Sequence, residues 1–107
     1  MFNHVDTSGK APAKYSAEDF LELLRALSDE NRQNIIKLFF SEKEVCVNDI
    51  ASHFTLSRPT ISHHLNLMKR ARLLKSRKEG KEVYYSVNRE YVIDIFEAFL
   101  KSFKNCC

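Results

Sequence analysis

The chain has 107 residues, of which 44% are hydrophobic, and its formal net charge is +3. This length makes one small domain. No apolar run approaches the ~18 residues that cross a membrane, and residues 1–16 lack the apolar core of a signal peptide. We therefore expect a cytoplasmic protein with no membrane partner, whose three cysteines, Cys46, Cys106 and Cys107, are mostly reduced.

The N-terminal half predicts a flexible arm and two helices. Residues 1–14 hold a glycine and a proline with few apolar residues, which is typical of a mobile arm. Ser16 with Asp19 three residues later predicts a helix start, and Ser28-Asp29 predicts the start of a second helix. The apolar residues at helical spacing are Phe20, Leu23, Leu24 and Leu27 in the first helix, and Ile35, Ile36, Phe39 and Phe40 in the second.

Two shorter helices are predicted next, joined by a tight turn. Val47, Ile50, Ala51 and Phe54 mark the third helix by their i, i+3, i+4, i+7 spacing. Ser57 is a suitable N-cap for the fourth helix, and a proline follows in its first turn. Because successive residues turn by 100°, the fourth helix has an inward stripe of Ile61, Leu65 and Met68 and an outward face of Pro59, His63, Asn66 and Arg70.

After Leu73 the apolar period changes from 3.6 to 2, which predicts a β-hairpin. Residues 78–81 lie between the two strands, and Gly80 supplies the positive φ that a hairpin turn needs. A fifth helix is predicted from about Arg89 to Lys104. The fold is therefore mainly α with a small β-hairpin, a winged helix-turn-helix of four helices, two strands and a last helix in residues 15–107.

The charge layout indicates a polyanion partner. Residues 58–87 hold eight lysines and arginines against two glutamates, whereas the rest of the chain holds nine basic and twelve acidic residues. A basic stripe on a helix-turn-helix with a hairpin is typical of binding to double-stranded DNA. The candidate DNA-binding residues are Ser57, Arg58, Thr60, Ser62, His63, Asn66 and Arg70 on the helix and Arg77, Lys78 and Lys81 on the hairpin.

The side chains of the fourth helix suit base edges and phosphates. Asn66 can bond an adenine and His63 a purine N7, while Ser57 and Thr60 are short enough to bond a phosphate at the helix N-terminus. The plain alternatives are a capped surface helix and a hairpin whose lysines protect an exposed strand edge.

The fifth helix carries more apolar residues than a lone terminal helix needs: Val92, Ile95, Phe96, Phe99, Leu100 and Phe103. It either packs on its own domain or forms a dimer seam. We favour the seam, because a helix-turn-helix protein gains specificity by binding two half-sites.

Two segments carry a family resemblance: ALSDENRQNIIKLFF and EVCVNDIASHFTLSRPTISHHLNLMKRARLLKSRKEGKEVYYSVN. They resemble the ArsR/SmtB family of bacterial and archaeal metal-sensing repressors, over residues from about 20 to 88. The resemblance implies a homodimeric winged-helix repressor that binds an imperfect inverted repeat and is released by an inducer. It also implies an interface between the first and last helices, with Phe20, Leu24, Val92, Phe96, Phe99 and Phe103 as its candidate residues.

The sensor is where this sequence departs from the family. Arsenic-sensing members carry Cys-Val-Cys-Asp-Leu-Cys at the start of the third helix, and here the second and third cysteines are replaced by Asn48 and Ala51. Zinc-sensing members use an aspartate and several histidines on the last helix, which here has Asp94 and Glu97 but no histidine. Neither family site is complete.

The remaining candidate ligands for an inducer are three thiols. Cys46 with Cys106 or Cys107 would bind As(III) or another soft metal ion, or react with a persulfide, if folding brings them together. The alternative is a regulator with no inducer site, in which Cys46 is a small buried hydrophobe. No cofactor is otherwise indicated.

Two further classes of function compete with a repressor. One is a winged helix that binds protein, whose basic face is incidental. The other is a small thiol oxidoreductase, which we reject because the sequence has no C-x-x-C and no phosphate loop. We therefore expect a transcriptional regulator and not an enzyme.

Overall fold

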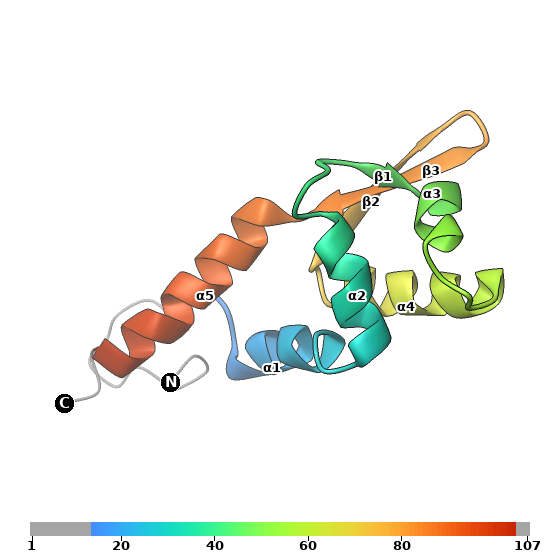
Figure 1. Ribbon diagram of the computed structural model, residues 1–107. Coiled ribbons are helices and arrows are strands. Elements are labelled where there is room, and N and C mark those ends of the chain that lie inside the picture. Colours follow the sequence, from blue (N-terminus) through green and yellow to red (C-terminus); the bar gives the residue numbers. More distant parts are fainter. Residues whose placement is uncertain (1–13, 105–107) are drawn as a thin grey trace.

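The computed structural model describes residues 14–104, and no helix in this range is long and apolar enough to cross a membrane. The elements follow one another as α1 (Ala17–Ala26), α2 (Glu30–Leu38), β1 (Val45–Cys46), α3 (Val47–Ser52), α4 (Arg58–Arg70), β2 (Leu74–Glu79), β3 (Glu82–Val87) and α5 (Arg89–Lys104) (Figure 1). The predicted arm, apart from Lys14, and the tail cysteines Cys106 and Cys107 lie outside the described residues.

The predicted helix starts are confirmed by their caps. The Ser16 hydroxyl accepts the Asp19 N–H at 3.1 Å, and the Asp19 carboxylate accepts the Ser16 N–H at 3.0 Å. Asp29 caps α2 by accepting the Arg32 N–H at 3.1 Å. Each cap satisfies N–H groups that the first turn of a helix leaves without a partner.

The second helix is shorter than its apolar pattern predicts. It ends at Leu38, and Phe39 is the C-cap. The prediction that Phe40 lies on the buried face is wrong, because its side chain is 81% exposed. The chain leaves the helix before Phe40, so the 100° step no longer decides where that side chain points.

The sheet has three strands, one more than predicted. β1 pairs antiparallel with β3, Val45 opposite Tyr85, and gives the strand order β1-β3-β2. The hairpin strands also extend further than expected, so that Glu79 faces Glu82 and only Gly80 and Lys81 form the turn. Gly80 has the predicted positive φ, +61°. The two-residue strand β1 was missed because its partner lies about forty residues away in the sequence.

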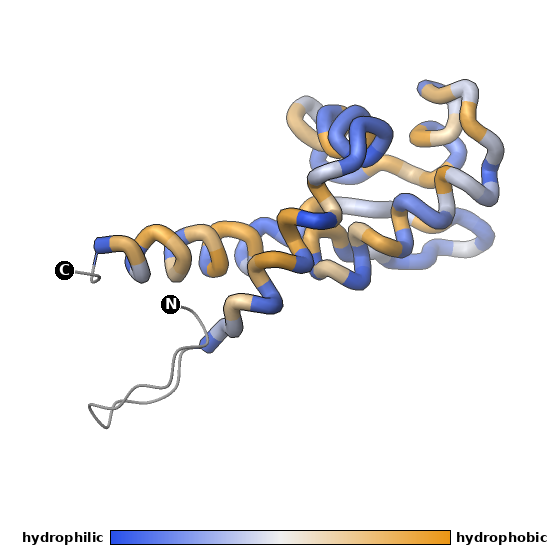
Figure 2. The backbone as a smooth tube through the Cα atoms, turned by 90° about the horizontal axis from the view of Figure 1, so that it is seen from below, coloured by the Kyte–Doolittle hydropathy of each residue, from blue (hydrophilic) through white to orange (hydrophobic). Residues whose placement is uncertain are grey.

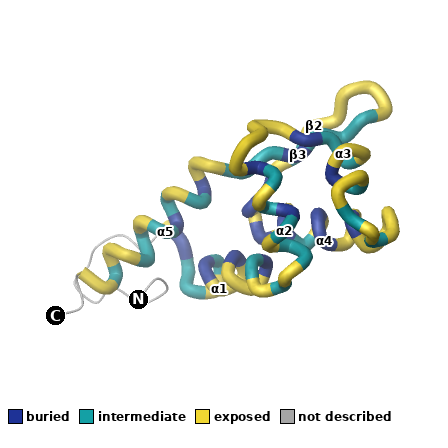
Figure 3. Tube along the Cα trace, in the orientation of Figure 1, coloured by how far each residue is buried: buried dark blue, intermediate teal, exposed yellow. Residues whose placement is uncertain are grey.

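One apolar core lies between the helices and the sheet. Ile61, Leu65 and Met68 of α4 are fully buried, as their spacing predicts, together with Leu23 of α1 and Ile35 of α2. Figure 3 shows that the inner helix faces are buried, whereas the tip of the β2–β3 hairpin and the outer face of α4 are exposed. The core therefore fixes which face of α4 meets solvent.

The end of α4 is unusual because Arg72 has a φ of +63°. The Arg72 N–H bonds the Lys69 carbonyl at 2.9 Å and the Leu73 N–H bonds the Met68 carbonyl at 3.0 Å, which is a Schellman motif with arginine where glycine is common. The Arg72 guanidinium pairs with Asp19 at 3.3 Å and lies 4.4 Å from the centre of the Tyr91 ring. It thus joins the end of α4 to α1 and α5.

We predict that Arg72→Gly is more stable than Arg72→Ala by about 1 kcal/mol, because left-handed backbone costs a residue with a Cβ roughly that much. Both variants lose the same contacts to Asp19 and Tyr91, so the comparison isolates the backbone. Urea unfolding midpoints measure the difference. An alanine variant as stable as the glycine variant contradicts a strained position.

Candidate nucleic-acid interface

Helices α3 and α4 and the turn between them form a helix-turn-helix. His53 is the C-cap of α3, and Ser57 is the N-cap of α4. The Ser57 hydroxyl accepts the Thr60 N–H at 3.3 Å and bonds the Thr60 hydroxyl at 2.9 Å. Pro59, which has no N–H to satisfy, occupies the first turn as predicted.

The outer face of α4 is polar and open to solvent. All seven candidate DNA-binding residues of the helix are exposed: Ser57, Arg58, Thr60, Ser62, His63, Asn66 and Arg70. The amide of Asn66, the ring of His63 and the hydroxyl of Ser62 form no hydrogen bond within residues 14–104 that would occupy them. This face therefore carries free hydrogen-bond donors and acceptors on a single helix, and a single helix fits into a major groove.

Arg58 is held in place by the rest of the module. Its guanidinium donates to the Asn48 side-chain oxygen, and the Asn48 amide donates to the Glu82 carboxylate at 3.2 Å. Asn48 lies on α3 and Glu82 on β3, so the bridge ties the start of α4 to the third helix and the wing. Arg58 thus has a structural role beside the predicted role in DNA binding.

Arg77 is also engaged within the chain. Its guanidinium donates to both oxygens of Glu44, at 2.7 and 2.8 Å, and to Glu79 at 3.1 Å, and it lies 4.7 Å from the centre of the Tyr84 ring. The hydrogen bonds from Arg77 lower the pKa of Glu44. Of the three predicted wing cations, only Lys78 and Lys81 form no ion pair in the part of the chain that the structure describes.

A buried contact beneath α4 was not predicted. His64 is 8% exposed, and its Nδ1 lies 3.2 Å from the Arg32 guanidinium. Arginine has only donors, so a hydrogen bond at this position requires His64 to accept through Nδ1. Arg32 also donates to the carbonyls of Ala26 at 2.7 Å and Arg25 at 3.3 Å. One side chain of α2 therefore holds the end of α1 and the middle of α4.

The spacing of residues carried a signal for this contact. His64 lies three residues after Ile61 and four before Met68, which places it on the same side of α4 as the buried stripe. The partner Arg32 gave no such signal, because the packing of α2 on α4 is a long-range contact. The same holds for Glu44 as the partner of Arg77.

The candidate interface residues on α1 and α5 divide into two groups. Phe20 is only 4% exposed. Its ring stacks on the Phe99 ring, with 4.2 Å between the ring centres, and its centre lies 5.3 Å from that of Phe96. These rings therefore pack α1 against α5 within one chain. Leu24 and Phe103 are 40% and 62% exposed. Other exposed apolar side chains accompany them: Leu21, Ile93 and Leu100. Figure 2 shows hydrophobic residues along α5, which extends away from the sheet.

Of the candidate thiols, only Cys46 is described. It is half-buried, pairs with Tyr84 in the sheet and is the N-cap of α3. Within residues 14–104 no group of three or more histidine, cysteine or acidic side chains is placed to hold a metal ion. The structure therefore places Cys46 at the start of α3, and the other two candidate thiols, Cys106 and Cys107, lie outside the described residues.

The fold and the outer face of α4 define a winged-helix DNA-binding regulator. Residues 29–76 match the family described as "Bacterial regulatory protein, arsR family". The chain is 42% identical over 97 residues to the cadmium resistance transcriptional regulatory protein CadC homolog of Staphylococcus aureus, covering 90% of this chain and 80% of that protein.

Two solved structures are similar in both fold and sequence. The transcriptional repressor PagR of Bacillus anthracis is 33% identical, with a TM-score of 0.62 over 77% of this chain and 93% of that one. The homodimeric winged helix-turn-helix domain of a possible ArsR-family regulator of Mycobacterium bovis is 25% identical, with a TM-score of 0.65 over 83% and 82% of the two chains. The chain belongs to the ArsR/SmtB family of transcriptional regulators and is not an enzyme.

We predict that His64 makes stability depend on pH. Burial lowers the pKa of His64, with Arg32 and the neighbouring His63 acting in the same direction and Asp29 opposing them. The folded state therefore binds a proton less readily than the unfolded state, and stability is lost as pH falls below the ordinary histidine pKa of about 6.5.

The measurement is the free energy of unfolding in urea between about pH 7.5 and about pH 5.5. The variant His64→Asn retains an acceptor for Arg32 without a group that titrates, so its stability should fall less than that of the wild type. Parallel curves for the two proteins would show that His64 does not titrate differently on folding.

Proposed function

We propose that the chain is a repressor that binds an inverted-repeat operator as a homodimer in the cytoplasm, with α4 in the major groove. The observation that carries this proposal is the exposed polar face of α4, held in one orientation by the buried stripe of Ile61, Leu65 and Met68. Membership of the ArsR/SmtB family supports the same role.

The two parts of the interface have different tasks. Asn66 and His63 lie on the middle of the exposed face of α4, where side chains meet base edges. Ser57 and Thr60 lie at the helix N-terminus, where phosphate is favoured by the helix dipole. Lys78 and Lys81 lie at the tip of the β2–β3 hairpin, and their mobile charges follow the DNA backbone or enter the minor groove.

We predict that His63→Ala and Asn66→Ala each weaken operator binding by ~1–3 kcal/mol and relax base preference. Lys78→Ala and Lys81→Ala should weaken binding to all sequences alike. Each should also reduce the slope of the logarithm of the binding constant against the logarithm of the salt concentration by about one. Fluorescence anisotropy over a range of salt concentrations measures both effects, with Lys101→Ala on α5 as the control.

The two sets of variants test the assignment separately. If the lysine variants change base preference and the α4 variants do not, the roles of helix and wing are reversed. DNA binding that hardly depends on salt would favour the rival interpretation, in which the winged helix binds protein and its basic face is incidental.

We further propose that the dimer forms through α1 and α5. In one chain Leu24, Leu100 and Phe103 remain exposed beside the aromatic cluster of Phe20 and Phe99. Exposed apolar side chains on two neighbouring helices suit a self-complementary patch. The patch is then supported from beneath by the rings of Phe20, Phe96 and Phe99. The side chains that contact the partner are Leu24, Val92 and Phe103.

Sedimentation at micromolar concentration should give roughly twice the chain mass of 12.5 kDa. Leu100→Asp should shift the protein towards the monomer, because a charge in an apolar interface loses its hydration. Phe40→Asp is the matched control, since Phe40 is 81% exposed but lies after α2. A monomeric wild type contradicts the two-half-site proposal, and equal effects of both variants contradict this interface.

The inducer proposal concerns the thiols. We propose that Cys106 and Cys107 bind As(III) or another soft metal ion, with Cys46 as a third ligand, or react with a persulfide. The cadmium-resistance name of the relative that is 42% identical supports metal sensing, and thiolates prefer soft ions. Such a ligand releases DNA only if it favours a dimer that binds DNA weakly.

Replacing both tail cysteines by serine should leave operator affinity unchanged and abolish release by arsenite or cadmium. Release in the wild type should strengthen as pH rises, because thiols must lose a proton to bind. Anisotropy of the operator complex during metal titration measures both effects. Undiminished release in a variant without any cysteine eliminates the thiol sensor and leaves a regulator without this inducer site.

A further inference from the structure

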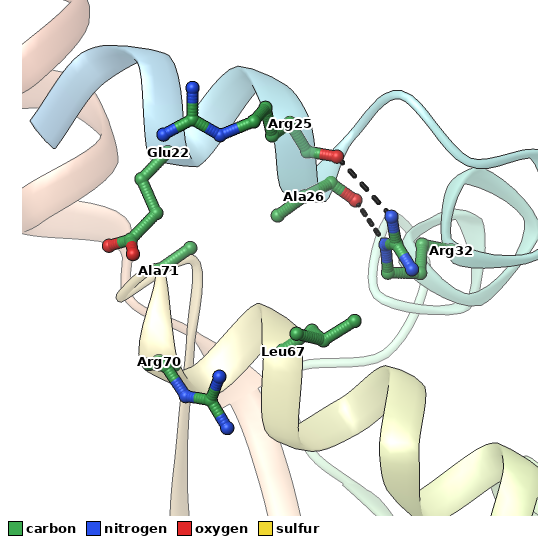
Figure 4. A pocket seen from close by; sticks show the side chains of 7 residues that line it. All are labelled: Glu22, Arg25, Ala26, Arg32, Leu67, Arg70 and Ala71. Atoms are coloured by element: carbon green, nitrogen blue, oxygen red, sulfur yellow. Dashed lines mark hydrogen bonds between the residues drawn. The ribbon is translucent and has the colours of Figure 1, made fainter. Parts of the chain in front are cut away.

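A cavity of about 220 Å³ lies between α1, α2 and α4, beside the DNA-binding face. Its lining residues come from these helices and from the C-cap of α4: Glu22, Arg25, Ala26, Arg32, Leu67, Arg70 and Ala71. Figure 4 shows the side chains of Glu22, Arg25, Arg32 and Arg70 around the space, with the small side chains of Ala26 and Ala71 between them. Sequence patterns do not predict this cavity, because its lining comes from three separate segments.

The lining is strongly cationic for its size. Three arginines and one glutamate give it a formal charge of +2. Arg25 pairs with Glu18 at 3.1 Å, outside the lining. Neither Arg32 nor Arg70 pairs with a carboxylate among residues 14–104. Two guanidinium charges therefore remain without an anionic partner at the edge of one cavity.

Arg32 is already fixed in place. Its Nε and one Nη bond the carbonyls of Ala26 and Arg25 (Figure 4). The other Nη bonds His64. A guanidinium has five N–H donors, so these three bonds leave donors for a ligand. Because the side chain is ordered before binding, a ligand would not have to immobilise it.

The cavity also has an apolar floor. Ala26 and Ala71 are 5% and 2% exposed, and Leu67 is half-buried beside them. The volume equals that of about seven water molecules, at ~30 Å³ each, and is smaller than the ~300–1,000 Å³ of sites for drug-sized ligands. An apolar body of only a few carbon atoms therefore fits.

We propose that this cavity binds a small organic anion. Its carboxylate or phosphate group lies between Arg70 and Arg32, whose guanidinium groups keep N–H donors for it. Its apolar part covers Ala26, Leu67 and Ala71. A DNA phosphate would meet Arg70 but brings no apolar group to this floor, so the geometry favours a small acid over the duplex.

Benzoate is a suitable probe, because it combines one carboxylate with a small apolar ring. Backbone amide shifts recorded during a benzoate titration, without DNA, should move and saturate at Ala26, Leu67 and Ala71. Benzyl alcohol is the uncharged control and should produce no saturable shift. Because no DNA is present, the result is independent of the proposed repressor function.

Arg70→Gln tests the site without disturbing the fold, because Arg70 is exposed and forms no hydrogen bond within the described residues. It should weaken benzoate binding about tenfold, since a charged hydrogen-bond pair is roughly twice as strong as a neutral one. Arg89→Gln, an exposed arginine at the start of α5, is the matched control and should bind like the wild type.

Three results would overturn the proposal. Benzoate that binds no better than benzyl alcohol shows that the cavity is not an anion site. Equal binding by Arg70→Gln and Arg89→Gln places the site elsewhere. Loss of DNA affinity in Arg70→Gln with no benzoate binding in the wild type assigns these arginines to the DNA backbone.

Discussion

The burial of one stripe of α4 is the constraint on which the rest of the structure depends. Ile61, Leu65 and Met68 have no exposed surface, and burying each contributes roughly 1.5–3 kcal/mol. A helix whose apolar stripe is fixed in a core cannot turn about its axis. His63 and Asn66 are therefore held outward on a rigid element, so that the base contacts proposed for them would require no reordering of the backbone.

Polar contacts fix the ends and the middle of the same helix. Arg58 joins its start to α3 and β3 through Asn48, Arg32 holds its middle through His64, and Arg72 joins its end to α1 and α5. Each of these three side chains bonds groups on a different helix. Arg72 thus contacts both of the helices, α1 and α5, that carry the proposed dimer interface.

The sequence predicted the features that depend on neighbouring residues. The caps at Ser16 and Ser57, the buried stripe of α4 and the turn at Gly80 follow from local hydrogen bonds and periodicity. Contacts between distant segments were missed, including strand β1 and the partners of Arg32 and Arg77. The left-handed Arg72 was missed for another reason, since glycine is the usual residue there. No local pattern identifies an arginine whose side-chain contacts offset backbone strain.

The most direct test of the account is to map backbone amide shifts of the full protein during titration with a duplex selected for tight binding. If α4 is held with its polar face outward for base contact, the largest changes lie at Ser62, His63 and Asn66 and at the Gly80–Lys81 turn. The amides of Ile61, Leu65 and Met68 should stay close to their free positions, because the core does not rearrange. Changes concentrated on α2 or the outer face of α5, with α4 unaffected, would contradict the account.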